Sequence, residues 1–79
     1  MKQFKESNNR MNLAKKGMLV LRAVMHWQSN TWRINYYTLK GGWARLDSYC
    51  AVSYPTRQEA EAHLRMLVKQ HPTKFIEDI

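Results

Sequence analysis

The stretch Thr31–Cys50 has the sequence TWRINYYTLKGGWARLDSYC, and it decides the fold. Two runs rich in aromatic and branched side chains, residues 31–39 and 43–54, flank the pair Gly41-Gly42. Such runs on either side of a glycine pair are typical of two strands joined by a tight turn. The sequence therefore predicts an antiparallel hairpin at the centre of the protein.

The register of this hairpin follows from which side chains would share a face. A three-residue loop at 40–42 pairs position 39 with 43, 37 with 45, 35 with 47 and 33 with 49, and opposed residues point to the same side. A mostly apolar face then consists of Trp32, Ile34, Tyr36, Leu46, Cys50 and Val52. The other face consists of Arg33, Asn35, Tyr37, Trp43, Arg45, Asp47 and Tyr49. A two-residue loop would mix these sets, so we expect the odd-numbered loop and a second face open to water.

Residues 18–27, upstream of the hairpin, fit two patterns. Apolar side chains at alternate positions are typical of a strand, and they are Leu19, Leu21, Ala23 and Met25. A second set spaced by three and four residues is typical of a helix, and it consists of Met11, Ala14, Met18, Leu21 and Met25. Because Gly17 would interrupt that helix near its middle, we favour the strand and keep the helix as the alternative.

Residues 1–17 are polar and basic. Either they are a flexible arm, or a short helix runs from about Asn9 to Lys16 with Ser7 or Asn8 as its N-cap. Gly17 would end that helix, because glycine readily adopts the left-handed conformation that follows a last turn. We treat residues 1–17 as an accessory segment and residues 18–79 as a single domain of sheet plus helix.

Downstream of the hairpin the pattern changes to that of a helix. Thr56, with Glu59 three residues later, forms a capping box. The apolar stripe that follows consists of Ala60, Leu64, Leu67 and Val68. Pro72 ends the helix, and the tail could add a short C-terminal edge strand through Phe75 and Ile76. The predicted fold is α+β, a three-stranded antiparallel meander with one C-terminal helix packed on its apolar face.

Positive charge is concentrated towards the N-terminus. Residues 1–17 hold five Lys or Arg against one acid, residues 18–55 hold four against one, and residues 56–79 hold four of each, within a net charge of +7. A lopsided basic protein is typical of one that binds a polyanion, and aromatic side chains among the bases suit stacked nucleobases. The expected nucleic-acid or partner-binding residues are Arg33, Tyr37, Trp43, Arg45, Tyr49, Arg22, Lys15 and Lys16.

A structural interpretation of the same residues stays open beside this one. Arg33 opposite Tyr49 and Arg45 opposite Tyr37 would form cross-strand cation–π pairs. In that case the side chains would stabilise the sheet instead of contacting a ligand.

The sequence carries no pattern that specifies catalysis, and we expect no enzyme. It has no glycine-rich phosphate loop, no nucleophile elbow and no carboxylates spaced for acid–base work. His63 and His71 are too far apart on the helix to share a metal ion, so no metal or cofactor is expected. Cys50 falls on the predicted apolar face, where a free cysteine behaves as a small hydrophobic residue.

The lone Cys50 cannot form an internal disulfide, which favours a reducing, cytoplasmic location. The apolar run Met18–Leu21 is too short for a signal peptide or a membrane span. We expect a soluble protein without a membrane partner.

Three segments resemble a known family. Trp32-Arg33-Ile34, the Gly41-Gly42 turn and the segment from Tyr54-Pro55-Thr56 to Glu59-Ala60 look like the small arm-type, AP2-like DNA-binding domains of phage integrases. The similarity covers residues 31–68. It implies a three-stranded sheet that enters the major groove and a helix that supports the sheet from behind. The chain departs from the family in carrying Asp47 and a single Arg on the third strand, and we expect no recombinase domain after it.

Two functions are expected from these features. The first is a small phage or mobile-element protein that contacts nucleic acid, duplex DNA above all, through the sheet face and the basic N-terminal segment. The alternative is a protein-binding inhibitor of a host defence complex, because anti-CRISPR and anti-restriction proteins are similar in size and in their lack of motifs. Pairing of exposed strand edges could also join two copies into a homodimer.

Overall fold

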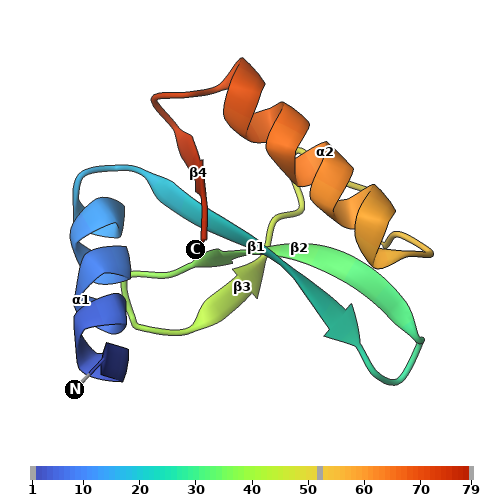
Figure 1. Ribbon diagram of the computed structural model, residues 1–79, viewed down its shortest axis with the longest axis horizontal. Coiled ribbons are helices and arrows are strands. Elements are labelled where there is room, and N and C mark those ends of the chain that lie inside the picture. The colour runs from blue at the N-terminus through green and yellow to red at the C-terminus, as the bar shows by residue number, and fades with distance from the viewer. Residues whose placement is uncertain (1, 52, 79) are drawn as a thin grey trace.

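The computed structural model describes residues 2–51 and 53–78 and shows an α+β fold. In this part of the chain the helices are α1 (Lys2–Lys15) and α2 (Arg57–Gln70). The strands are β1 (Leu19–His26), β2 (Thr31–Tyr37), β3 (Trp43–Arg45) and β4 (Phe75–Glu77). They form one mixed sheet in the order β3-β2-β1-β4, and the strands lie between the two helices (Figure 1).

The predicted meander makes up only part of this sheet. β1, β2 and β3 are antiparallel neighbours, whereas β4 pairs parallel to β1, with Leu19 beside Phe75 and Leu21 beside Glu77. Parallel strands require a crossover connection, and α2 supplies it. The edge strand predicted at Phe75 and Ile76 is therefore confirmed, and the three-stranded, purely antiparallel sheet is corrected to a mixed sheet of β1–β4.

The N-terminal part of the chain forms a helix followed by a strand. Residues 18–27 contain β1, so the favoured prediction of a strand is confirmed for this segment and the helix is excluded. α1 begins at Lys2, so Ser7 and Asn8 lie inside the helix. The prediction that one of them is the N-cap is therefore wrong. Gly17 follows the helix with a φ of 90°, a conformation that other residues rarely adopt. α1 packs against β1 and β2, and such packing stabilises a helix that would be marginal alone.

The β2–β3 turn is longer than predicted. Tyr37 pairs with Trp43 and Asn35 with Arg45, so the loop comprises residues 38–42. The Thr38 N–H donates to the Gly42 carbonyl oxygen (2.8 Å), and the Thr38 hydroxyl also bonds to Gly42. The predicted pairs 39–43, 37–45, 35–47 and 33–49 are wrong by two residues. The loop is nevertheless odd-numbered, so odd residues of β2 and β3 do share a face.

The third strand is much shorter than the predicted run 43–54. β3 ends at Arg45, and Tyr49 and Cys50 both pack towards the core. Adjacent residues of a strand point to opposite faces, so this segment cannot continue the strand. Tyr54 returns to β2 and exchanges two backbone hydrogen bonds with Trp32, of 2.8 and 2.7 Å. Val52, which was expected on the apolar face, lies outside the described residues.

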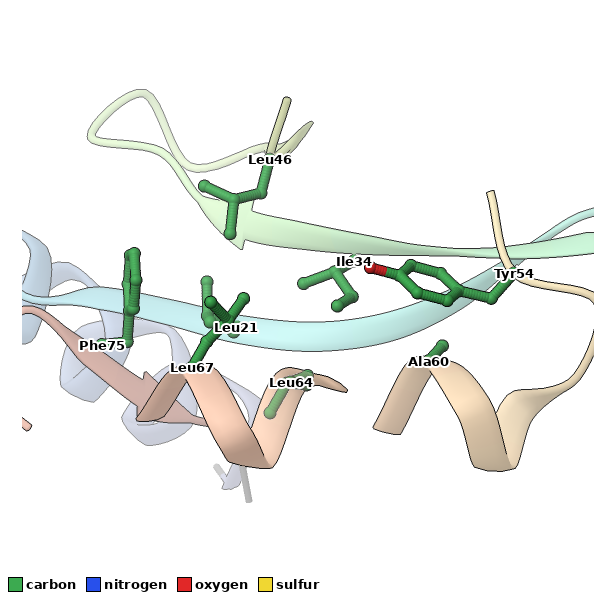
Figure 2. Packing of buried hydrophobic residues seen from close by; sticks show 8 residues of the cluster. All are labelled: Leu21, Ile34, Leu46, Tyr54, Ala60, Leu64, Leu67 and Phe75. Atoms are coloured by element: carbon green, nitrogen blue, oxygen red, sulfur yellow. The ribbon is translucent and has the colours of Figure 1, made fainter. Parts of the chain in front are cut away.

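α2 covers one face of the sheet and completes the core. Its N-cap is Thr56, whose hydroxyl accepts the N–H of Glu59 at 3.2 Å, as the capping box predicts. Apolar side chains of α2 point towards the strands, and the buried cluster consists of Leu21, Ile34, Leu46, Tyr54, Ala60, Leu64, Leu67 and Phe75 (Figure 2). The opposite face of the sheet is left for α1 and for solvent.

Candidate functional site

The face of the sheet opposite α2 carries the cationic residues of the central strands. Odd-numbered residues of β2 and β3 lie on it, and the even-numbered residues of β1 continue it, because Arg22 pairs with Asn35 and Val24 with Arg33. Asn35 in turn pairs with Arg45. We call this surface the arginine face, and its residues are Arg22, Arg33, Asn35 and Arg45. Its three arginines are among the binding residues expected from the sequence, and the structure brings them together on this face.

α1 covers one end of the same side of the sheet. Arg10 of α1 lies over the rings of Tyr37 and Trp43, with its guanidinium carbon 6.0 and 5.3 Å from their centroids. The guanidinium also forms a two-pronged ion pair with Asp78, Nε to Oδ1 at 2.8 Å and Nη2 to Oδ2 at 3.0 Å. Because this pair is partly buried and charge-assisted, it holds α1 against the end of β4.

Tyr37 and Trp43 were expected to offer stacking planes to a ligand. Tyr37 is only 6% exposed, so its placement on a water-facing surface is wrong. Trp43 is half-buried, and the guanidinium carbons of Arg10 and Arg22 lie 5.3 and 4.7 Å from its ring centroid. Its ring also meets that of Tyr37 edge-on, with the centroids 5.3 Å apart. α1 docks on a face that strand alternation alone would leave to water. These two rings therefore help to hold α1 in place.

Tyr49 lies on the other side of the molecule. Its ring centroid is 5.0 Å from that of Phe75 and 5.7 Å from that of His71. The ammonium group of Lys74 bonds to its hydroxyl. The prediction that Tyr49 shares a face with Arg33 is wrong, because the chain leaves the sheet after β3 and strand alternation ends there.

Beyond α1 the arginine face is partly accessible: Arg22 and Arg45 are exposed, whereas Arg33 and Asn35 are half-buried. β3 pairs with β2 only at residues 35–37, and β4 pairs with β1 only at residues 19–21. Past the bridge between Trp32 and Tyr54, the sheet therefore consists of β1 and β2 alone up to the turn that joins them. We call residues 22–34 the β1–β2 ribbon, and its turn lies far from α1 (Figure 1).

Two features leave the arginine face able to accept an anion. Arg45 pairs with Asp47, but both residues are exposed, and an exposed pair contributes only about 0–1 kcal/mol. A phosphate could therefore replace Asp47 at small cost. Arg33 Nε and Asn35 Oδ1 are buried without a hydrogen-bond partner among the described residues, a state that polar atoms rarely adopt. Rotation of the Arg33 side chain would let its Nε–H donate to a phosphate oxygen, whereas Asn35 Oδ1 is an acceptor and would require a donor such as a base amino group.

Lys15 and Lys16 lie at the border of this surface. Both are exposed where α1 ends, and Lys16 lines a groove with Val20 and Ile76 between α1 and the β1–β4 edge. They add positive charge near the start of β1 and lie away from the β1–β2 turn.

Trp27 is not among the binding residues expected from the sequence. This residue is 78% exposed and stands in the turn between β1 and β2. A signal was present, because an aromatic residue directly precedes the polar turn residues Gln28, Ser29 and Asn30. The placement of Trp27 at the end of a projecting ribbon comes only from the structure.

A second polar cluster joins the segment after β3 to α2. The Tyr54 hydroxyl is hydrogen-bonded to His63 Nδ1 and accepts the N–H of Ala51 at 3.2 Å. Burial raises the pKa of the Cys50 thiol and of the Tyr54 hydroxyl above their ordinary values of 9.0 and 10.0. A thiol with a raised pKa is a weak nucleophile near neutral pH. Within residues 2–51 and 53–78, no three His, Cys, Asp or Glu gather in a way that could hold a metal ion.

These raised pKa values predict a loss of stability at alkaline pH. The unfolded chain gives up the Cys50 and Tyr54 protons first, from about pH 9 upwards, so ionisation then favours unfolding. We expect the free energy of unfolding, measured by urea titration, to fall between about pH 9 and about pH 11. Cys50→Ala should lose less stability than wild type over this interval. Equal losses in the two proteins would contradict the assignment to Cys50.

Comparison with protein-family models, with curated proteins and with solved structures finds no match to the chain. None of the helices described above combines the length and the apolar character needed to cross a membrane. The function must therefore be argued from the geometry and charge of the site.

Proposed function

We propose that the protein is a non-catalytic DNA-binding protein whose arginine face contacts duplex DNA. The observation that carries this proposal is the placement of Arg22, Arg33 and Arg45 on one sheet face, where Arg22 and Arg45 are exposed. Guanidinium groups bind phosphate oxygens, and they also bind the edge of guanine. The Asn35 amide beside them is suited to the edge of adenine.

The shape of the β1–β2 ribbon supports the same proposal. Neighbouring strands lie about 4.8 Å apart, and the major groove, about 12 Å wide, admits a two-stranded ribbon. α2 packs on the other face of β1 and β2 and would support the ribbon from behind. The resemblance to arm-type domains implies such an arrangement, although α1 on the sheet face departs from it.

Charge supplies most of the expected affinity. Arg22 and Arg33 would contact phosphates directly, Arg45 would exchange Asp47 for a phosphate, and Lys15 and Lys16 would add long-range attraction. Phosphate contacts position a protein without reading sequence, so we expect a modest sequence preference.

Salt dependence tests the proposal. We expect duplex DNA to bind more tightly than single-stranded DNA or RNA in filter-binding or gel-shift titrations at two ionic strengths. The slope of log affinity against log salt should be about −3 to −5, which corresponds to roughly four to six phosphates. A flat salt dependence, or no binding at about 50 mM salt, would refute DNA binding.

One observation favours a second candidate, a protein-binding inhibitor of a host defence complex. Leu39, in the β2–β3 turn, is 60% exposed, and exposed apolar side chains can anchor protein interfaces. This candidate predicts a stoichiometric protein partner that is retained after nuclease treatment. Leu39→Ala should release that partner while leaving DNA affinity unchanged.

A further inference from the structure

We propose that Trp27 is a base-stacking residue, whose indole packs against the face of a nucleobase in DNA held by the arginine face. This inference rests on the proposed function and deepens it. It adds a contact residue outside the arginine face and names a feature of the ligand, a base whose face is not covered by its neighbour.

The first argument is the exposure of Trp27. His26 pairs with Thr31, so the turn comprises residues 27–30 and Trp27 is its first residue. The side chain is 78% exposed, and Met25, on the adjoining strand, is also exposed. An indole is a large flat surface suited to stacking, and every nucleobase presents a matching face.

Side-chain hydrogen bonds stabilise the conformation of the turn that carries Trp27. His26 Nδ1 is hydrogen-bonded to the Ser29 hydroxyl at 2.9 Å, and the Ser29 and Thr31 hydroxyl oxygens are 2.7 Å apart. Asn30 has a φ of 55°, in the left-handed region that asparagine tolerates well. A turn fixed in this way loses little freedom on binding, so more of the stacking energy appears as affinity.

The third argument is the spacing along the ribbon. A strand rises about 3.3 Å per residue, so Trp27 lies about 10 Å along β1 from Val24, the residue opposite Arg33. It lies about 17 Å along β1 from Arg22. Bases in duplex DNA are stacked about 3.4 Å apart, so these lengths span about three and five base steps. A β1–β2 ribbon that lies along a groove could therefore bind phosphates through Arg22 and Arg33 and contact a base through Trp27.

The fourth argument is charge. Acidic side chains near the ribbon are paired with arginines: Asp47 with Arg45, and Glu61 with Arg57. Arg57 also lies over the Trp32 ring, 5.6 Å from its centroid, on the α2 side of the ribbon. Arg33 lies on the other side. A polyanion that approaches the turn therefore meets cationic side chains on both faces of the ribbon.

The stacked base could come from two sources. It could already be unpaired, at a bulge or a gap, or the indole could wedge between two stacked base pairs and separate them. Wedging costs the unstacking energy, which an unpaired base does not require. Tighter binding to a bulged duplex than to a perfect one would identify an unpaired base as the preferred source.

The test measures affinity and base unstacking together. Wild type, Trp27→Ala, Trp27→Phe and Leu39→Ala are titrated against perfect and bulged duplexes that carry 2-aminopurine, whose fluorescence rises when it is unstacked. Leu39→Ala is the matched control, because Leu39 is also an exposed apolar residue in a hairpin turn. Far-UV circular dichroism and urea titration of each variant verify that it is folded.

We expect Trp27→Ala to lose roughly tenfold to hundredfold in affinity and to abolish the 2-aminopurine signal. Trp27→Phe should retain part of both, and Leu39→Ala should match wild type. The salt slope of Trp27→Ala should stay that of wild type, because no phosphate contact is removed.

Other outcomes separate the two proposals. If wild type binds DNA and Trp27→Ala binds equally well with the same fluorescence change, base stacking is refuted and DNA binding stands. If wild type does not bind DNA, both proposals fall. If Trp27→Ala binds DNA normally but loses a nuclease-resistant protein partner, the stacking role is also refuted, and the turn belongs to a protein interface.

Discussion

Leu64→Ala is expected to unfold a large fraction of the protein at room temperature. Leu64 is 1% exposed in the middle of α2 and belongs to the cluster that joins this helix to β1, β2 and β4. Replacing a buried leucine by alanine costs about 2–5 kcal/mol, because apolar burial is lost and a cavity remains. A core of this size rarely supplies more than about 3–5 kcal/mol of net stability. The substitution therefore removes most of the free energy of unfolding.

Urea titration followed by far-UV circular dichroism measures this effect, and Met66→Ala is the matched control. Met66 lies two residues further along α2 but is 46% exposed, so its replacement should change stability by at most about 0.5 kcal/mol. Similar unfolding midpoints for the two variants would contradict the packing of α2 on the sheet.

The double variant Arg22→Ala, Arg33→Ala is expected to lose about a hundredfold in affinity for duplex DNA. Hydrogen bonds that involve a charged group contribute about 1.5–3 kcal/mol each, so two lost contacts weaken binding at least this much. The slope of log affinity against log salt should become less steep by about two, because about one counterion is released per phosphate contact. Affinity for every duplex sequence should fall by a similar factor.

A control variant with the same change in net charge distinguishes the loss of direct contacts between the arginine face and DNA from a weaker overall electrostatic attraction. Arg65→Ala, Lys69→Ala also removes two positive charges, but both residues are exposed on α2, away from the arginine face. We expect this control to change affinity much less and to keep the salt slope. Equal losses in the two double variants would show that binding depends on net charge and not on the arginine face. Arg22→Ala also removes the cation–π contact with Trp43, so the stability of each variant is measured in parallel.

Local patterns predicted the elements whose stabilising contacts are close in sequence. The helix that starts after Thr56 depends on a cap formed within four residues, and its buried stripe follows from helical spacing. β1 and β2 depend on apolar alternation and on the turn that joins them. The odd-numbered turn after β2 could be chosen because a two-residue loop would mix the two faces, with Leu46 beside Tyr37 and Arg45 beside Tyr36.

Contacts between distant segments explain the features that local patterns predicted wrongly, namely the length of β3, the pairing of β4 and the burial of Tyr37. Strand propensity extended β3 to residue 54, but Tyr49 and Cys50 are bound to the core by Phe75, His71 and Tyr54, which come from later in the chain. The parallel pairing of β4 depends on α2 crossing the sheet. The burial of Tyr37 depends on Arg10, 27 residues earlier, and on its ion pair with Asp78.

The amino-acid sequence determined an α+β domain with a C-terminal helix, and it placed Arg33 and Arg45 on the same sheet face, because alternation and capping act over a few residues. Tertiary structure alone decided how much of that face stays open. α1 buries its aromatic end, the chain leaves the sheet after β3, and Trp27 is left at the end of a two-stranded ribbon. These outcomes depend on contacts between segments far apart in the chain, for which no local pattern supplies the free energy.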